Sequence, residues 1–186
     1  MRRVVLALAA LALLAACKRE AGPPAPTAPV AAAMAEDEMS QTLKGAEAFV
    51  TRVYREFEGF ANAPPETMAQ PPENARVYDK SMLALLAQAE RLASDESAPW
   101  EADPLCECQD PAGMTSAIEM TGQTGATAGA KVKLGFGPKV WQELVLDLIF
   151  EDGHWRVHDI KTGDLPSARE TLVRFNKEMG GAGKKP

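Results

Sequence analysis

The chain has 186 residues, of which 46% are hydrophobic and 25% are charged. This balance is typical of soluble globular proteins and excludes a disordered or integral-membrane chain. The length fits one domain that can bury a core without a metal or a disulfide framework. The formal net charge is −6, and no basic stripe is visible, which excludes nucleic acid as a partner.

The first 17 residues have the form of an export signal. Met1-Arg2-Arg3 is positively charged, and the uncharged apolar run of 13 residues that follows is too short to cross a bilayer comfortably. The ending Leu14-Ala15-Ala16-Cys17 resembles the bacterial lipoprotein box. The resemblance implies that residues 1–16 are a signal peptide and that Cys17 is lipidated, while Lys18 in the next place implies an outer-membrane anchor facing the periplasm. The alternative is an ordinary secretory signal with an incidental cysteine.

The remaining chain divides into three parts. Residues 18–39 hold four prolines and seven alanines without sustained apolar periodicity, so residues 17–39 are predicted to be the lipidated cysteine and a tether. Residues 40–179 are predicted to form one α+β domain. The glycine-rich residues 180–186 are predicted to be a flexible tail.

Two amphipathic helices are predicted first. Between Ser40 and Phe60, apolar residues recur at steps of three and four, which places them on one helix face. The proline-rich stretch 61–72 is predicted to be a loop. The helical spacing returns from Tyr78 to Leu92, with a wider apolar face that indicates burial on more than one side.

The pattern changes to the alternation of strands from Met114 onward, and its clearest part is a hairpin around Asp152-Gly153. This dipeptide favours a type I′ turn, because both residues tolerate positive φ. Pairing outward from the turn predicts these opposite pairs: Phe150 with Trp155, Ile149 with Arg156, Leu148 with Val157, Asp147 with His158, and Leu146 with Asp159. A Ser-x-x-Glu capping box from Ser167 to Glu170 then predicts a short closing helix.

The predicted fold class is α+β, with helices packed on one face of a curved antiparallel sheet. The order of elements, Gln109-Asp110, the segment Asp152–Ile160, Ser167 and Leu172 look like an uncharacterised family of exported bacterial proteins. The resemblance covers about residues 45–176. It implies the cystatin-like cone fold shared by nuclear transport factor two and ketosteroid isomerase, but no particular activity, since that fold serves binding, catalysis and dimerisation.

Asp159 is the first candidate site residue. The predicted register places it among the apolar side chains of the hairpin, where a carboxylate costs several kcal/mol unless it is paired or hydrogen-bonded. It could be a general base with a pKa raised by burial, as in cone-fold enzymes. The interpretation we favour is structural, with hydrogen bonds from the following loop or a helix amide. Trp155 and Asp159 are also the candidates for lining a ligand pocket.

Two further pairs are candidates. Asp147 and His158 are predicted to face one another across the hairpin, as a general base couple or, more commonly, as a solvated cross-strand pair. Cys106 and Cys108 are predicted to form a disulfide, because exported thiols are usually oxidised, and an exposed bridge of this kind could be redox-active. A packed, reduced pair is the alternative. The spacing is not that of a zinc site, so no metal and no cofactor are predicted.

The sequence predicts a lipid-anchored periplasmic binding or interaction module. Its expected partners are the membrane, through the Cys17 lipid, and an unknown protein or small-molecule ligand, with a homodimer possible. One alternative is a hydrolase or isomerase that uses a pocket carboxylate, for which Asp159 is the candidate. Another is an inhibitor or immunity-type protein directed at an envelope enzyme.

Overall fold

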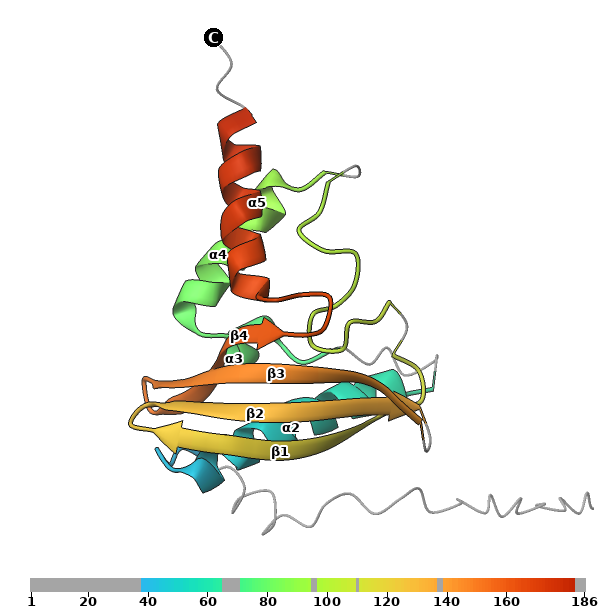
Figure 1. Ribbon diagram of the computed structural model, residues 1–186, viewed down its shortest axis with the longest axis vertical. Helices are drawn as coiled ribbons and strands as arrows, with labels where there is room; N and C mark the ends of the chain where they lie inside the picture. The colour runs from blue at the N-terminus through green and yellow to red at the C-terminus, as the bar shows by residue number, and fades with distance from the viewer. Residues whose placement is uncertain (1–37, 65–70, 95–96, 110, 137–138, 183–186) are drawn as a thin grey trace, which may run out of the picture.

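The computed structural model describes residues 38–64, 71–94, 97–109, 111–136 and 139–182. Within these ranges, three helices come first, followed by four strands and a closing helix (Figure 1). In chain order these are α2 (Leu43–Ala61), α3 (Asn74–Val77), α4 (Lys80–Leu92), β1 (Met114–Thr124), β2 (Thr127–Phe136), β3 (Lys139–Glu151), β4 (His154–Lys161) and α5 (Ala168–Ala182).

The four strands form one antiparallel sheet in the order β1-β2-β3-β4, and the sheet is curved. Alternate residues of β3, Leu144, Leu146 and Leu148, are at most 1% exposed and pack into the core. Helices pack against this sheet, so the predicted α+β class is confirmed.

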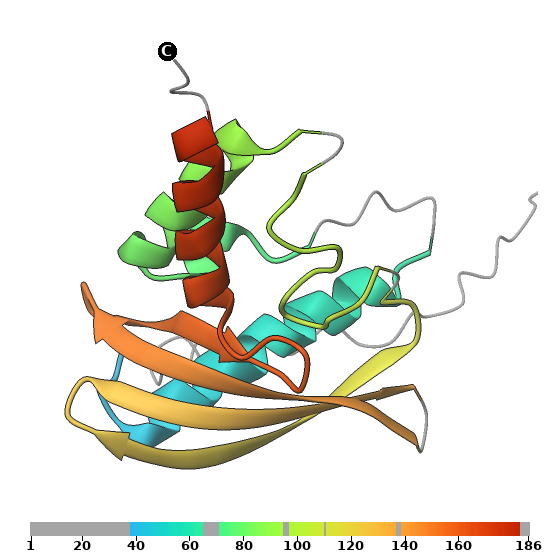
Figure 2. The ribbon, with the colours of Figure 1, turned by 45° about the horizontal axis from the view of Figure 1, so that its top comes forward.

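Helix α2 covers one face of the sheet and contacts β1, β2 and β4 (Figure 2). It begins after Thr42, whose side chain accepts a hydrogen bond from Gly45 N at 3.1 Å and caps the first turn. Phe49, Val53 and Phe57 recur every four residues and are buried. The predicted helix is therefore confirmed, and its apolar face packs into the core.

Helices α4 and α5 pack against each other beyond β4, instead of lying across the sheet (Figures 1 and 2). They contact the sheet through β4, and Asp79 N donates to Val157 O at 3.1 Å where the chain enters α4. Asn176 of α5 donates to Leu85 O of α4 at 3.0 Å. Helix α4, the second predicted helix, therefore packs against both α5 and β4, which agrees with its wide apolar face.

The β3–β4 hairpin has the predicted turn, because Asp152 and Gly153 both adopt positive φ, at 50° and 79°. The predicted pairs next to the turn are also present. Farther out the predicted register is wrong: Leu146 pairs with Ile160, and Asp147 pairs with Asp159. A β-bulge around His158 inserts one residue into β4, and a bulge of this kind has no signature in the alternation of the sequence.

Both ends of the domain extend beyond the predicted boundaries. Glu38, assigned to the tether, forms an ion pair with Arg52 of α2 at 2.8 Å. At the other end, α5 continues through Gly180 and Gly181 to Ala182, so part of the predicted flexible tail is helical. The leader and Cys17 lie outside the described residues. No helix in the described ranges is long and apolar enough to span a membrane.

Candidate functional site

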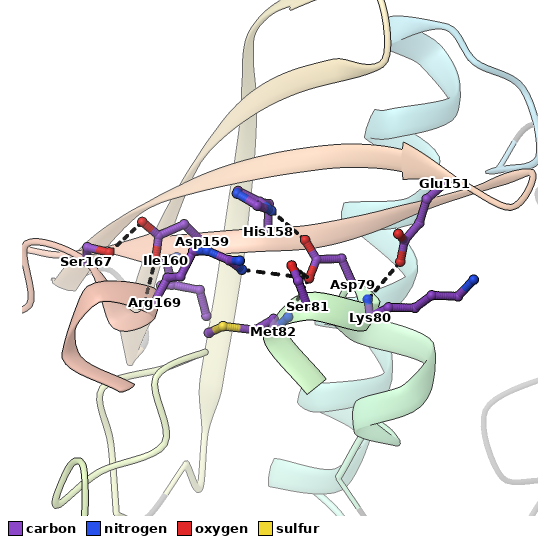
Figure 3. A network of polar contacts seen from close by, with 10 residues as sticks. All are labelled: Asp79, Lys80, Ser81, Met82, Glu151, His158, Asp159, Ile160, Ser167 and Arg169. Atoms are coloured by element: carbon purple, nitrogen blue, oxygen red, sulfur yellow. Dashed lines mark hydrogen bonds and ion pairs between the residues drawn. The ribbon is translucent and has the colours of Figure 1, made fainter. Parts of the chain in front are cut away.

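The first group of polar residues lies at the junction of β4 with α4 and α5. Figure 3 shows Asp79 at the start of α4 close to His158, and Asp159 close to Ser167 and Arg169 at the start of α5. Asp79 is 2% exposed and Asp159 is 7% exposed. Two buried carboxylates therefore join the edge of the sheet to the first turns of two helices.

Asp79 caps α4. Its Oδ1 accepts from Met82 N at 2.6 Å and from Ser81 Oγ at 2.8 Å, and its Oδ2 contacts His158 Nδ1. Burial alone would raise the pKa of Asp79, but the hydrogen bonds from Met82, His158 and Ser81 outweigh burial and lower it. Asp79 is therefore ionised at neutral pH, and His158 Nδ1 must be the donor.

The predicted pairing of Asp147 with His158 is wrong. His158 contacts Asp79, and Asp147 instead forms an ion pair with Lys161 at 2.6 Å. The bulge is the reason, since it shifts His158 out of register with Asp147. Both residues still border one depression on the sheet, together with residues of β1 and β2.

The His158–Asp79 contact has the form of a general base couple, and the side chain of His158 is 39% exposed. A nucleophilic enzyme would need a hydroxyl or thiol beside the imidazole. Among the described residues, no Ser, Thr or Cys side chain is hydrogen-bonded to His158. The contact joins β4 to the first turn of α4 and so clamps these two elements together.

Asp159 accepts three hydrogen bonds, from Ser167 Oγ at 2.7 Å, from Arg169 N at 3.0 Å and from Ile160 N at 2.9 Å. Ser167 Oγ in turn accepts from Glu170 N at 2.9 Å, as the predicted capping box requires. Asp159 does not occupy the predicted core position, because the bulge gives that position to Ile160. Both oxygens of Asp159 therefore accept hydrogen bonds, from β4 itself, from the loop after it and from the first turn of α5.

Trp155 and Asp159, the predicted pocket residues, line neither the depression beside Asp147 and His158 nor the pocket between α2 and α4. Trp155 is fully buried, packs edge to face on Phe150 with ring centroids 5.3 Å apart, and donates from Nε1 to Ser40 O at 2.9 Å. Asp159 is covered by the start of α5. Both residues hold the fold together. A pocket lies elsewhere in the domain.

That pocket, about 590 Å³, lies between α2, α4 and the segment that precedes β1. Its apolar and aromatic walls come from Phe57 of α2, Tyr78 before α4, Leu86 of α4 and Trp100. Asn74 and Gln109 add amide groups. Apolar walls with a few polar groups are the usual composition of a small-molecule site.

The charged side chains among the described lining residues are Glu101 and Asp103, both acidic. Asp103 is exposed to solvent, yet the protein packed around its carboxyl group raises its pKa. A hydrogen bond from Leu105 N, at 2.8 Å, lowers that pKa only in part. Within the described ranges, Asp103 forms no ion pair with a Lys, Arg or His side chain.

The segment that carries Asp103 is held in several ways. Cys106 and Cys108 are joined by a disulfide, and the main chain of Asp103 pairs with that of Cys108. Cys106 N and Glu107 N donate to Asp103 O at 3.1 and 2.6 Å, and Tyr54 OH donates to Leu105 O at 3.0 Å. Cys106 is fully buried and Cys108 is 7% exposed, so the disulfide is not the exposed bridge that redox activity would require.

Asp79 and Asp103 are not among the site residues predicted from the sequence. Asp79 has a local signal, because an Asp directly before an apolar helical run is a typical N-cap. Asp103 has none, since its environment is made by α2 and α4, which are distant in the sequence. The sequence gives no significant match to a protein-family model, to a curated protein or to a solved structure.

Proposed function

We propose that the protein is a lipid-anchored module of the bacterial envelope that binds a small organic ligand in the pocket between α2 and α4. The observation that carries this proposal is the composition of the pocket: aromatic and apolar walls, two amides and two carboxylates. The disulfide and the hydrogen bonds of residues 103–108 hold one wall in place before a ligand arrives. A preformed wall lowers the ordering cost of binding.

The proposed location of the protein is inferred from its leader sequence. The proposed cone fold is inferred from the order of helices and strands. Export with a lipid on Cys17, followed by a tether rich in proline and alanine, places the domain near the outer membrane, facing the periplasm. Two long helices followed by an antiparallel meander agree with the cone fold.

Lipidation of Cys17 is the first expected result. Cells grown with a radioactive fatty acid should label the wild-type protein and leave Cys17→Ala unlabelled, because the thiol is the attachment point of the lipid. The label is followed by gel electrophoresis of the immunoprecipitated protein. Cys106→Ser is the matched control and should keep its label. Equal labelling of wild type and Cys17→Ala would remove the anchor from the proposal.

Binding in the pocket is the second expected result. N-phenyl-1-naphthylamine, a neutral apolar dye that fluoresces on leaving water, should bind the wild-type domain saturably. Ala102→Trp fills the pocket, because Ala102 lines it, and should weaken binding at least roughly tenfold, the effect of losing about 1.4 kcal/mol of contact energy. Ala87→Trp, on an exposed position of α4, is the control and should bind as the wild type does.

Absence of saturable dye binding to the wild-type domain would contradict a ligand pocket. Equal binding by Ala102→Trp and wild type would place the dye at another site and contradict this pocket. Circular dichroism melting curves of the two Trp variants establish that each is folded before the titrations are compared.

A hydrolase or isomerase is the second candidate function, and one observation favours it. Asp103 is a carboxyl group that borders the pocket and has a raised pKa, the property of a general base in a partly desolvated site. In this alternative Asp103, and not Asp159, is the pocket carboxylate. Turnover abolished by Asp103→Asn, with dye binding retained, would distinguish catalysis from binding alone.

A further inference from the structure

We infer that the pocket between α2 and α4 selects an organic cation with an apolar body, such as a quaternary or primary amine, in preference to neutral or anionic molecules of the same shape. This inference rests on the proposed function and adds the chemical class of the ligand. It follows from the arrangement of charge and aromatic surface around the pocket.

Charge is the first argument. Glu101 and Asp103 are the charged groups among the described lining residues, and both carry negative charge when ionised. Neither forms an ion pair with a Lys, Arg or His side chain within the described ranges. An anionic ligand would meet two like charges, whereas a cation would supply the missing countercharge.

Aromatic surface is the second argument. Phe57, Tyr78 and Trp100 line the same pocket as the two carboxylates. The faces of aromatic rings attract cations, and Trp does so most strongly. Phe57 and Tyr78 are buried, and Trp100 is half-buried and keeps more of its ring accessible. An aromatic ring and a carboxylate in one pocket are the combination that recognises a substituted ammonium group, because the apolar substituents contact the ring while the charge is balanced.

Rigidity is the third argument. Leu105 N donates to Asp103 Oδ1 at 2.8 Å, and the main-chain bonds of Asp103 to Cys106, Glu107 and Cys108 fix the residue from both sides. The carboxylate is therefore held at the pocket before binding, so a cation gains its attraction without ordering a flexible side chain. The raised pKa of Asp103 is consistent with this, because an unpaired carboxylate in a partly desolvated place lacks a stabilising cation.

The test compares three probes that share a benzyl group by calorimetric titration of the full domain at neutral pH. They are benzyltrimethylammonium, its uncharged isostere neopentylbenzene, and the anion phenylacetate. The cation should bind roughly tenfold more tightly than the isostere, and the anion should bind more weakly than both. Asp103→Asn should bring the affinity for the cation close to the affinity for the isostere, because it removes the carboxylate that attracts the positive charge.

Asp164→Asn is the matched control, because it removes one exposed carboxylate outside the pocket and should leave the preference unchanged. Equal affinity of wild type for the cation and the isostere would overturn the inference while the pocket stands. The inference would also be overturned if the preference for the cation survived both in Asp103→Asn and in the double variant that adds Glu101→Gln. Failure of the proposed function is distinguishable, because then neither the dye nor any of the three probes binds in a way that Ala102→Trp prevents.

Discussion

Replacing Asp79 with alanine is expected to lower the free energy of unfolding by about 3 kcal/mol. The variant loses the N-cap of α4, which leaves Met82 N without its acceptor at a cost of about 1 kcal/mol or more. It also leaves His158 and Arg169 without the carboxylate that they contact. Urea unfolding followed by circular dichroism measures the change.

Two variants make the Asp79 experiment specific. Lys80→Ala, at the neighbouring exposed position, should unfold at the same urea concentration as the wild type, because the ion pair of Lys80 with Asp152 is fully exposed. Asp79→Asn keeps an acceptor for Met82 N but loses the charge, so its stability should fall between those of wild type and Asp79→Ala. A midpoint for Asp79→Ala equal to that of wild type would contradict the role of Asp79 as a clamp.

The charge of Asp79 also predicts a pH dependence. Because its pKa is lower in the folded protein than in the unfolded chain, folding binds fewer protons, and the stabilisation is present above the unfolded pKa of about 3.9. It is lost as the pH falls through the folded pKa. The difference in stability between wild type and Asp79→Asn should therefore narrow below pH 4. A difference that stays constant from pH 7 to pH 3 would show that the charge contributes nothing.

Replacing Asp159 with alanine is expected to lower the free energy of unfolding by about 2 kcal/mol. Its carboxylate accepts from two backbone amides and from Ser167 Oγ, and all three donors lie in a nearly closed junction. Without the acceptor, Ile160 N and Arg169 N lose their partners, and water has little access to replace it. Thermal melting and urea unfolding both report the loss.

Asp147→Ala is the matched control for Asp159, because the two residues are paired across β3 and β4. Asp147 forms a half-exposed ion pair with Lys161, and exposed pairs of this kind contribute well under 1 kcal/mol. The stability of Asp147→Ala should therefore change little. Equal effects of the two substitutions would contradict the assignment of the buried role to Asp159.

The prediction of Asp159 from sequence was reached through a register that the structure corrects. Alternation along β4 predicts an acid among core side chains, and the bulge at His158 instead gives that place to Ile160. Asp159 is nevertheless buried, because the first turn of α5 covers it. The sequence contains the acid and the capping box of α5, but not the bulge that brings them together, since a bulge depends on the contacts of β4 with its neighbours.

The sequence by itself determined the local features of this protein. Steps of three and four predict the two long helices, alternation predicts the strands, and Asp152-Gly153 predicts the turn between β3 and β4, because helix faces, strand faces and positive φ depend on residues close in the chain. Together these features define the α+β class. The tertiary structure alone decided the pairing of Asp79 with His158 and the pocket around Asp103. These sites join α2, α4, β4 and the segment before β1, and their burial and electrostatics exist only when elements distant in the sequence pack together.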